Sequence, residues 1–444
     1  MSDLLISRRA RTLLTATAAL PLSLVATTVL TAQQPAAATS TPPDARVEAV
    51  MKKAPVIDGH NDLPWEMREK VRYDWDARDI AKPQPVMMTD IPRLRSGHVG
   101  GQFWSVYVPA TLQGDAAVSA TLEQVDSVYE MVRRYPNVFT LVRTADEMAA
   151  AMKAGRIGSL MGMEGGHSID SSLATLRMFR RLGVGYMTLT HSANVPWADS
   201  CTDVPTLQGL SKFGEEVVRE MNRIGMLVDL SHVSPDTMAD AIRVSQAPVI
   251  FSHSNAKAVA DSPRNVPDEI LKQVVTNRGI VMVTFVPGFT SSEVAAYNRR
   301  ATEQNKQFAT QFPNDTAAQA AALAVWRKSN PEPRATLAQV ADHVDHIRKV
   351  AGIDHIGFGG DFDGITSVVQ GLEHVGTYPA LVAELMRRGY TEADVAKITS
   401  GNILRVMREA EAVSAKLRTT PPSIKTIDKV DGITPRGQAV ATSR

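Results

Sequence analysis

Eight short, almost continuous apolar runs recur along the chain, separated by longer segments with an apolar position every three or four residues. The runs occupy residues 56–62, 103–108, 157–164, 185–191, 226–232, 248–253, 280–285 and 355–361. Such runs are typical of parallel strands that helices cover from outside. The segments between them, such as 122–135, 171–182, 210–224, 234–245 and 335–352, have helical periodicity. Several begin with Ser, Thr or Asp, which are preferred at helix N-termini.

Eight strand–helix units in one chain predict an α/β fold, a (β/α)8 barrel of the TIM type. The alternative is an open doubly wound sheet. That fold normally carries a Gly-rich phosphate turn after its first strand, and no such turn follows residues 56–62. With 444 residues, of which 44% are hydrophobic, the chain can bury one large core or two modest ones.

The N-terminal residues 1–38 are interpreted as a signal peptide and linker. A basic start is followed by the uncharged apolar segment TATAALPLSLVATTVL and then by small residues, with cleavage expected between Ala32 and Ala38. The pair Arg8 and Arg9 fits a twin-arginine signal, but an ordinary Sec signal fits equally. We therefore expect an exported protein, periplasmic or secreted, with no stable membrane span once the signal is removed.

The remainder divides into a single catalytic barrel, residues 39–413, and an irregular C-terminal tail, residues 414–444. Within the barrel, the polar, helix-prone segment 290–333 interrupts the alternation between the last two strands. Loops that follow strands surround the active mouth of a barrel, so this insert either roofs the site or decorates the surface. After Ser414 the chain is rich in Thr, Pro and Lys and loses its periodicity.

Composition narrows the classes of partner. Lys and Arg number 48 and Asp and Glu 47, giving a net charge of +1, which gives no indication of nucleic acid or an anionic membrane as a partner. Cys201 is the only cysteine, so the chain has no internal disulfide. We interpret Cys201 as a buried or half-buried thiol rather than a metal ligand.

Residues able to bind a metal close the apolar runs, and this is the main chemical signal of the sequence. Imidazole and carboxylate are the ligands that zinc prefers, and a series of them at successive strand ends predicts a metal site at one end of a parallel barrel. The residues concerned are His60, Asp62, Glu164, His191, His232 and His253.

The positions of these residues suggest which of them bind the same metal ion. His60 and Asp62 lie two apart on a strand and face the same side, so both can reach one metal. Glu164 precedes two glycines, and its two oxygens can bridge two metals, unless it only caps the next helix. His232 and His253 end adjacent strands and suit a second metal. His191 is either a further ligand or a donor to an oxyanion.

Two further positions have open roles at this stage. Asp361 and Asp363 end the last run and share parity, so pattern alone cannot choose which is a ligand, a general base or a cap. Arg264 follows the sixth run, where it either pairs with a substrate carboxylate or forms a salt bridge with Asp261.

The motifs VIDGHNDLPW, GMEGGHSI, TLTHSANVPWADS, LVDLSHVSPDTM, VIFSHSNA, RNVPDEIL, GFGGDFDG and GNILRVM resemble the membrane (renal) dipeptidase family of zinc peptidases over residues 54–412. The resemblance implies a barrel of the metal-dependent hydrolase kind and an exported bacterial dipeptidase. Vertebrate relatives carry disulfides and a lipid anchor; this chain has one Cys and no apolar C-terminal tail.

The resemblance also implies residue roles. His60 and Asp62 would bind one Zn2+ and His232 and His253 the other, with Glu164 bridging the two ions. His191 would bind substrate near the scissile carbonyl, Arg264 would hold the terminal carboxylate, and Asp361 would carry the proton. A metal-bridging hydroxide would attack the peptide bond of a dipeptide, including one with a C-terminal D-residue.

Other readings remain open at the level of function. A different amide or lactone hydrolase on the same scaffold is one, because the fold does not determine the substrate. A binding protein without catalysis is another, although it would be expected to have lost at least one of these residues. A homodimer is left open.

Overall fold

The computed structural model describes residues 45–437, in which nine strands form one parallel sheet. They are β1 (Val56–Asn61), β2 (Val99–Ser105), β3 (Phe139–Leu141), β4 (Ile157–Glu164), β5 (Val184–Thr188), β6 (Leu227–Asp229), β7 (Ile250–Phe251), β8 (Ile280–Val283) and β9 (Ile356–Phe358).

Eight of these strands close into a barrel. Each pairs in parallel with its neighbour in the order β1, β2, β4, β5, β6, β7, β8, β9, and β9 returns to β1 through Asp58 and Phe358. β3 pairs with the first half of β4, outside this ring. The predicted (β/α)8 barrel is therefore confirmed, and the open sheet is excluded.

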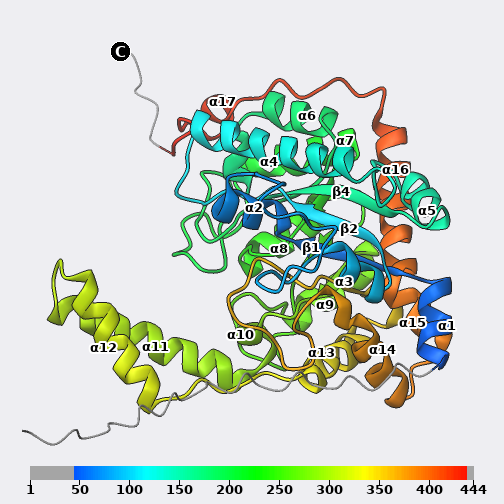
Figure 1. Ribbon diagram of the computed structural model, residues 1–444. Helices are drawn as coiled ribbons and strands as arrows, with labels where there is room; N and C mark the ends of the chain where they lie inside the picture. The colour runs from blue at the N-terminus through cyan, green and yellow to red at the C-terminus, as the bar shows by residue number, and fades with distance from the viewer. Residues whose placement is uncertain (1–44, 438–444) are drawn as a thin grey trace, which may run out of the picture. The chain divides into compact units, whose positions relative to one another are not determined.

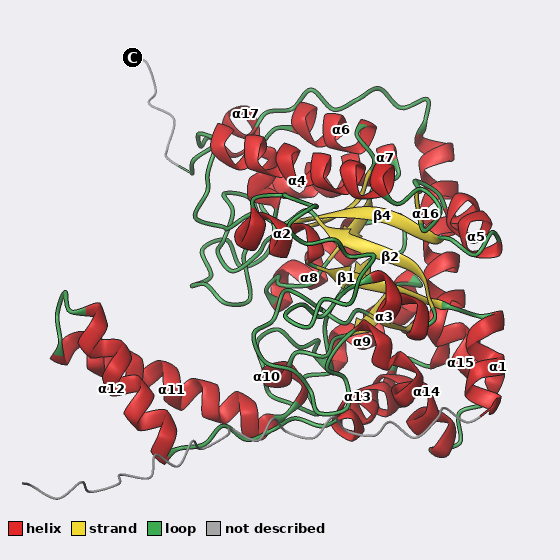
Figure 2. Ribbon diagram, in the orientation of Figure 1, coloured by secondary structure: helices red, strands yellow, loops and turns green. Residues whose placement is uncertain are grey.

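Helices surround the strands (Figures 1 and 2). The α-helices are α1 (Ala45–Lys53), α2 (Leu63–Val71), α3 (Ile91–Ser96), α4 (Asp115–Arg134), α5 (Ala145–Lys153), α6 (Leu173–Arg181), α7 (Lys212–Ile224), α8 (Pro235–Val244), α9 (Asp268–Asn277), α10 (Pro287–Thr290), α11 (Ser292–Gln311), α12 (Thr316–Ser329), α13 (Leu337–Val350), α14 (Tyr378–Arg387), α15 (Glu392–Ala396), α16 (Asn402–Leu417) and α17 (Ile427–Asp431). Short 3-10 turns occupy Gly166–Ile169, Ile353–His355 and Val375–Thr377, and a π-helical turn, Lys397–Gly401, joins α15 to α16.

Apolar side chains fill the barrel from strand to strand. One buried cluster combines residues of β1, β2, β4, β5, β6, β7 and β8, including Ile57, Phe103 and Ile280, with residues of α5 and α16. A larger buried cluster includes residues of the strands and of the helices around them. The barrel is thus a packed core rather than a pore, and the ends of the strands are left for chemistry.

The strand after α3 lies earlier than the sequence predicts. We expected a strand at 103–108, but β2 is Val99–Ser105. The prediction starts too late because Gly100 and Gly101 are not typical strand residues. A Cβ atom on Gly101 would lie 2.6 Å from the Met148 sulfur, so Met148 of α5 packs directly against the strand at this point. Tyr107 consequently lies in the loop at the carboxyl end of the barrel, not in the strand.

The C-terminal part carries more structure than its composition indicates. The tail was expected to be irregular from residue 414, but α16 continues to Leu417 and α17 follows, with Ile427 almost fully buried. Asp431 accepts hydrogen bonds from the Ser211 hydroxyl and the Phe213 amide at the start of α7, which holds this segment against the barrel.

The predicted signal peptide and linker, residues 1–38, lie outside the described residues. Within residues 45–437, no helix is both long and apolar enough to cross a membrane.

Candidate metal centre and substrate cavity

The six metal-ligand candidates meet at the carboxyl end of the barrel. His60 is in β1, and Asp62 lies between β1 and α2, at the residue directly before the helix. Glu164 ends β4, while His191, His232 and His253 follow β5, β6 and β7 within two or three residues. Convergence follows from topology, since the carboxyl ends of all parallel strands lie at the same end of the barrel.

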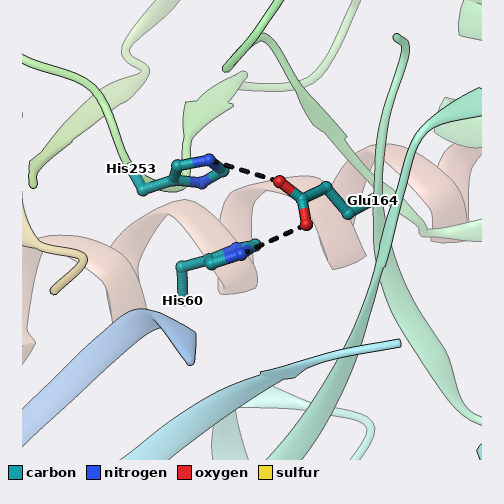
Figure 3. Close-up of side chains that lie close together, drawn as sticks. All are labelled: His60, Glu164 and His253. Atoms are coloured by element: carbon teal, nitrogen blue, oxygen red, sulfur yellow. Dashed lines mark ion pairs between the residues drawn. The ribbon is translucent and has the colours of Figure 1, made fainter. Parts of the chain in front are cut away.

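Glu164 lies at the centre of this group, with one oxygen directed to each side (Figure 3). Its Oε2 atom is 3.4 Å from His60 Nε2, and its Oε1 atom is 2.9 Å from His232 Nε2 and 3.5 Å from His253 Nε2. Asp62 Oδ2 lies 3.2 Å from His60 Nε2 on the first side. The carboxylate therefore has the geometry of a bridge between two positions, and it does not act as a helix cap.

Backbone conformation positions these side chains. Gly165, directly after Glu164, has φ +110°, which an L side chain rarely adopts, so the turn that ends β4 requires glycine. His232 has φ +69°, in the left-handed region that non-glycine residues seldom occupy. Uncommon backbone of this kind is concentrated at functional sites, where the surrounding structure enforces it.

The donor set fits a divalent metal. Three groups of residues have ligand atoms within 4.8 Å of one another: His60, Glu164 and His253; Glu164, His191 and His232; and His60, Asp62 and Asp361. The buried Nε2 atom of His60 has no hydrogen-bond partner among the described residues, although carboxylates face it. A buried nitrogen without a hydrogen-bond partner, aimed at carboxylates, is what a metal-binding imidazole presents.

Electrostatics favour positive charge between the ligands. Burial lowers the pKa of His232 and His253 well below its usual value, which keeps both rings neutral, the form that binds metal. Burial opposes the charged form of His60, but Tyr186, Asp62 and Glu164 outweigh it and raise the His60 pKa. Burial would also raise the pKa of Glu164, but the surrounding imidazoles lower it well below its usual range.

Asp361 and Asp363, which pattern could not separate, lie in different surroundings. Asp361 lines the cavity, and burial together with Asp62 and Glu164 raises its pKa well above the usual value. Asp363 turns away and accepts a hydrogen bond from the Met88 amide at 2.7 Å. Geometry therefore favours Asp361 as the group that meets a substrate.

Arg264 is 3% exposed and forms no ion pair with any described residue. Its guanidinium donates to the Ser254 hydroxyl at 3.4 Å and to the His253 carbonyl at 3.2 Å, and it lies 5.0 Å from the Phe289 ring centroid. Asp261, the alternative partner, is 3.9 Å from Lys257 instead. A buried cation without a carboxylate indicates a site for an anionic group of a ligand.

His191 is the least enclosed of the histidines at the centre. Its Nε2 atom is 3.8 Å from Glu164 Oε1, and its ring packs against Tyr107 and His232. Burial lowers the His191 pKa, and the buried Nδ1 atom has no hydrogen-bond partner among the described residues. The ring can therefore serve either role that the sequence left open.

A cavity of about 480 Å³ opens onto this centre. Its size suits a small ligand rather than a long peptide. Sequence reasoning missed most of its wall, because these residues carry no metal-binding chemistry; the wall includes Trp65, Tyr107, Phe289, Asn298 and residues 364–367.

Two secondary expectations can also be compared with the structure. Cys201 is half-buried, as expected, and belongs to none of the groups able to hold a metal. Asp58 shares the parity of His60 and Asp62, so the sequence allows it either to orient His60 or to fill the barrel as a buried carboxylate with its hydrogen bonds satisfied. The structure favours the second role, since Asp58 accepts hydrogen bonds from the His60 and Gly360 amides and from Tyr378. The His60 ring is held instead by Tyr186, whose hydroxyl is 3.0 Å from Nδ1.

Comparison with known proteins agrees with this geometry. A family model described as membrane dipeptidase, peptidase family M19, matches residues 44–421. Dipeptidase 3 of Mus musculus is 41% identical over 386 residues, which are 85% of this chain and 69% of that protein.

Solved structures share the fold. The probable dipeptidase PvdM from Pseudomonas aeruginosa is 22% identical, with a TM-score of 0.72, over 83% of this chain and 98% of that one. A metallo peptidase from Rhodobacter sphaeroides, liganded with a phosphinate mimic of the dipeptide L-Ala-D-Ala, is 25% identical, with a TM-score of 0.67, over 80% and 99%. The resemblance that the motifs indicated is thereby confirmed, and the chain belongs to the membrane dipeptidase family, peptidase family M19.

Proposed function

We propose that this protein is a metal-dependent dipeptidase that binds two zinc ions per chain. The family and the relatives support metal-dependent dipeptide hydrolysis; the zinc identity, the count and the role of each residue are our proposal. The single observation that carries the count is Glu164, whose Oε2 atom faces His60 and whose Oε1 atom faces His232 and His253.

The chain's own residues have distinct tasks in this reaction. His60 and Asp62 would hold one ion, His232 and His253 the other, and Glu164 would be shared. When bound, the ions supply Lewis acidity and lower the pKa of water so that it can attack a carbonyl carbon.

Proton movement falls to Asp361. Water adds its oxygen to the peptide carbon, the carbon–nitrogen bond breaks, and the proton that water loses passes through the Asp361 carboxylate to the leaving amine. His191 donates to the carbonyl oxygen as negative charge develops there. Arg264 holds the free carboxylate of the C-terminal residue, which sets the substrate's register.

Arg264 also separates this function from the alternatives. A general amide or lactone hydrolase has no need of a buried cation beside the metal centre, whereas a dipeptide always ends in a carboxylate. The relative bound to an L-Ala-D-Ala mimic makes dipeptides with a C-terminal D-residue the first class to test.

The experiment combines metal analysis with a substrate panel. Purified protein should contain two zinc ions per chain, lose activity in a chelator and recover it with zinc. It should hydrolyse L,L- and L,D-dipeptides and spare tripeptides and N-acylated amides. Active protein with one ion or none would refute the binuclear proposal, and hydrolysis of lactones alone would favour the other hydrolase.

We also propose export through the N-terminal segment. N-terminal sequencing of mature protein from the producing cell should give a start between residues 32 and 38. An intact Met1 in the cytoplasm would contradict this.

A further inference from the structure

We propose that the two metal positions are made unequal by the groups behind their histidines. A buried relay of Asp229 and Ser252 orients His253 and adds negative charge behind it, whereas an uncharged phenol, Tyr186, stands behind His60. The inference rests on the proposed function and deepens it, because it names residues that tune one of the two metal positions.

The relay lies at the carboxyl ends of β6 and β7: Asp229 is the last residue of β6, and Ser252 directly follows β7. His253 Nδ1 is 2.8 Å from the Ser252 hydroxyl, and that hydroxyl donates to Asp229 Oδ2 at 2.6 Å. All three residues are at most 1% exposed, so water does not compete for these hydrogen bonds.

The direction of each hydrogen bond follows from counting donors. Asp229 Oδ2 accepts from Ser252 and from the Thr188 hydroxyl at 2.5 Å, and Oδ1 accepts from the amides of Ser252 and Ser231. Ser252 has one hydroxyl hydrogen, and it goes to Asp229. Its oxygen must then accept from the ring, so the hydrogen of neutral His253 lies on Nδ1.

This tautomer is the one that a metal ligand needs. With Nδ1 protonated, the lone pair of His253 lies on Nε2, which faces Glu164 Oε1 at 3.5 Å and His232 Nε2 at 2.9 Å. A carboxylate behind a ligating imidazole fixes the ring and increases its basicity. The serine passes this effect on, since the Asp229 carboxylate does not contact the ring directly.

The position of His60 is supported differently. Its Nδ1 atom is 3.0 Å from the Tyr186 hydroxyl, which in turn donates to the Gly59 carbonyl at 3.4 Å. These two hydrogen bonds also fix the tautomer of His60, but they end on a neutral carbonyl. Of the two histidines, only His253 therefore gains negative charge from behind.

The test is a titration of metal-free protein with Zn2+ against a competing chelator, which gives two binding constants without any measurement of activity. Ser252→Ala should lower one constant about tenfold to a hundredfold, the usual effect of removing a group behind a metal ligand, and leave the other within about twofold. Tyr186→Phe should lower the other constant, and the two effects should add in the double variant.

Thr188→Val provides a matched control. It removes one hydroxyl donor from the same Asp229 oxygen, as Ser252→Ala does, but Thr188 does not contact His253. Its zinc constants should stay close to those of the unmodified protein. Asp229→Asn, which keeps the shape and removes the charge, should repeat the loss at one position, and far-UV circular dichroism verifies that each variant folds.

Three outcomes would overturn the inference. Equal losses in Ser252→Ala and Thr188→Val would show a general effect of leaving Asp229 short of donors. Unchanged constants in folded Ser252→Ala and Asp229→Asn would show that the relay does not act on the metal. A loss in Ser252→Ala and Tyr186→Phe at the same ion would remove the proposed asymmetry. If the unmodified protein does not bind two ions, the proposed function fails first, and this result is distinct from the other three.

Discussion

At the residue scale, the two aspartates after β9 provide the sharpest test of the proton carrier. Asp361→Asn should keep the metal content near normal and lower kcat about a hundredfold to ten-thousandfold, because a general acid–base group is lost. Asp363→Asn is the matched control, since Asp363 contacts the Met88 amide outside the cavity. Steady-state kinetics with metal analysis decide between them, and a harmless Asp361→Asn beside a damaging Asp363→Asn would reverse the assignment.

Arg264 gives a second prediction at this scale. Dipeptides should be cleaved far faster than their C-terminal amides, because an amide leaves the buried guanidinium without an anion. Loss of one member of a buried pair costs on the order of 3 kcal/mol, about a hundredfold in kcat/KM. Arg264→Ala should lose most of this preference, and Arg264→Lys should keep part of it. Equal rates for acid and amide in the unmodified protein would place the carboxylate elsewhere.

The sequence predicts the candidate metal ligands well, but it does not predict the residues that hydrogen-bond to them. His60, Glu164 and His253 stand out because charged or imidazole groups rarely end apolar runs. Tyr186 and Ser252 do not stand out, since a tyrosine or serine in a strand has an ordinary place in a core. Their contacts with the ligands depend on neighbouring strands, which no pattern within one run encodes.

At the scale of elements, His343 of α13 connects two loops near the centre. Its Nδ1 atom accepts from the Ala256 amide at 3.1 Å, and Nε2 donates to the Thr290 carbonyl at 3.0 Å. Only the neutral ring makes both hydrogen bonds, and burial lowers the His343 pKa to about 4. The ring thereby ties the loop after β7 to the end of α10.

This contact predicts a pH dependence of stability. The folded pKa of about 4 lies below the unfolded value of about 6.5, so the unfolded chain binds more protons between these values. The contribution of His343 is complete above about pH 6.5 and is lost as the pH falls toward 4, by up to about 3 kcal/mol. His343→Gln should remove this part of the slope in denaturant unfolding at saturating zinc; parallel curves for both proteins would contradict it.

The observed bounds of several elements differ from those that the sequence pattern predicts. All eight predicted strands exist, but β7 contains only Ile250–Phe251, because the chain leaves the sheet early to bring His253 into the centre. β3 was not predicted, since three residues carry no detectable period. The π-helical turn Lys397–Gly401 between α15 and α16 was likewise not predicted, since helical periodicity does not distinguish a π turn from an α turn.

At the scale of the whole chain, the insert is the part whose role the sequence left open. α11 and α12 pair as a helical hairpin that leads away from the barrel (Figure 1). Buried residues of α11 are confined to its first turns, at Val294, Ala295 and Tyr297, and none of α12 is buried. In the cavity wall, the insert contributes only Asn298, while Phe289 of α10 precedes it. We therefore predict that the base of the hairpin forms part of the cavity wall and that its tip does not cover the cavity.

Shortening the hairpin tests this division. Replacing residues 304–319 by a short Gly/Ser linker keeps Tyr297 beside Trp326, whose rings are 5.7 Å apart. The change should leave Tm essentially unshifted and dipeptide kcat/KM within about twofold. Phe289→Ala is the contrasting variant, because it removes the ring that lies 5.0 Å from the Arg264 guanidinium. A desolvated cation–π contact contributes up to about 2 kcal/mol, so this change should lower kcat/KM roughly tenfold, mainly through KM. A large loss of turnover in the shortened protein, with Phe289→Ala unaffected, would instead make the tip of the hairpin the roof of the site.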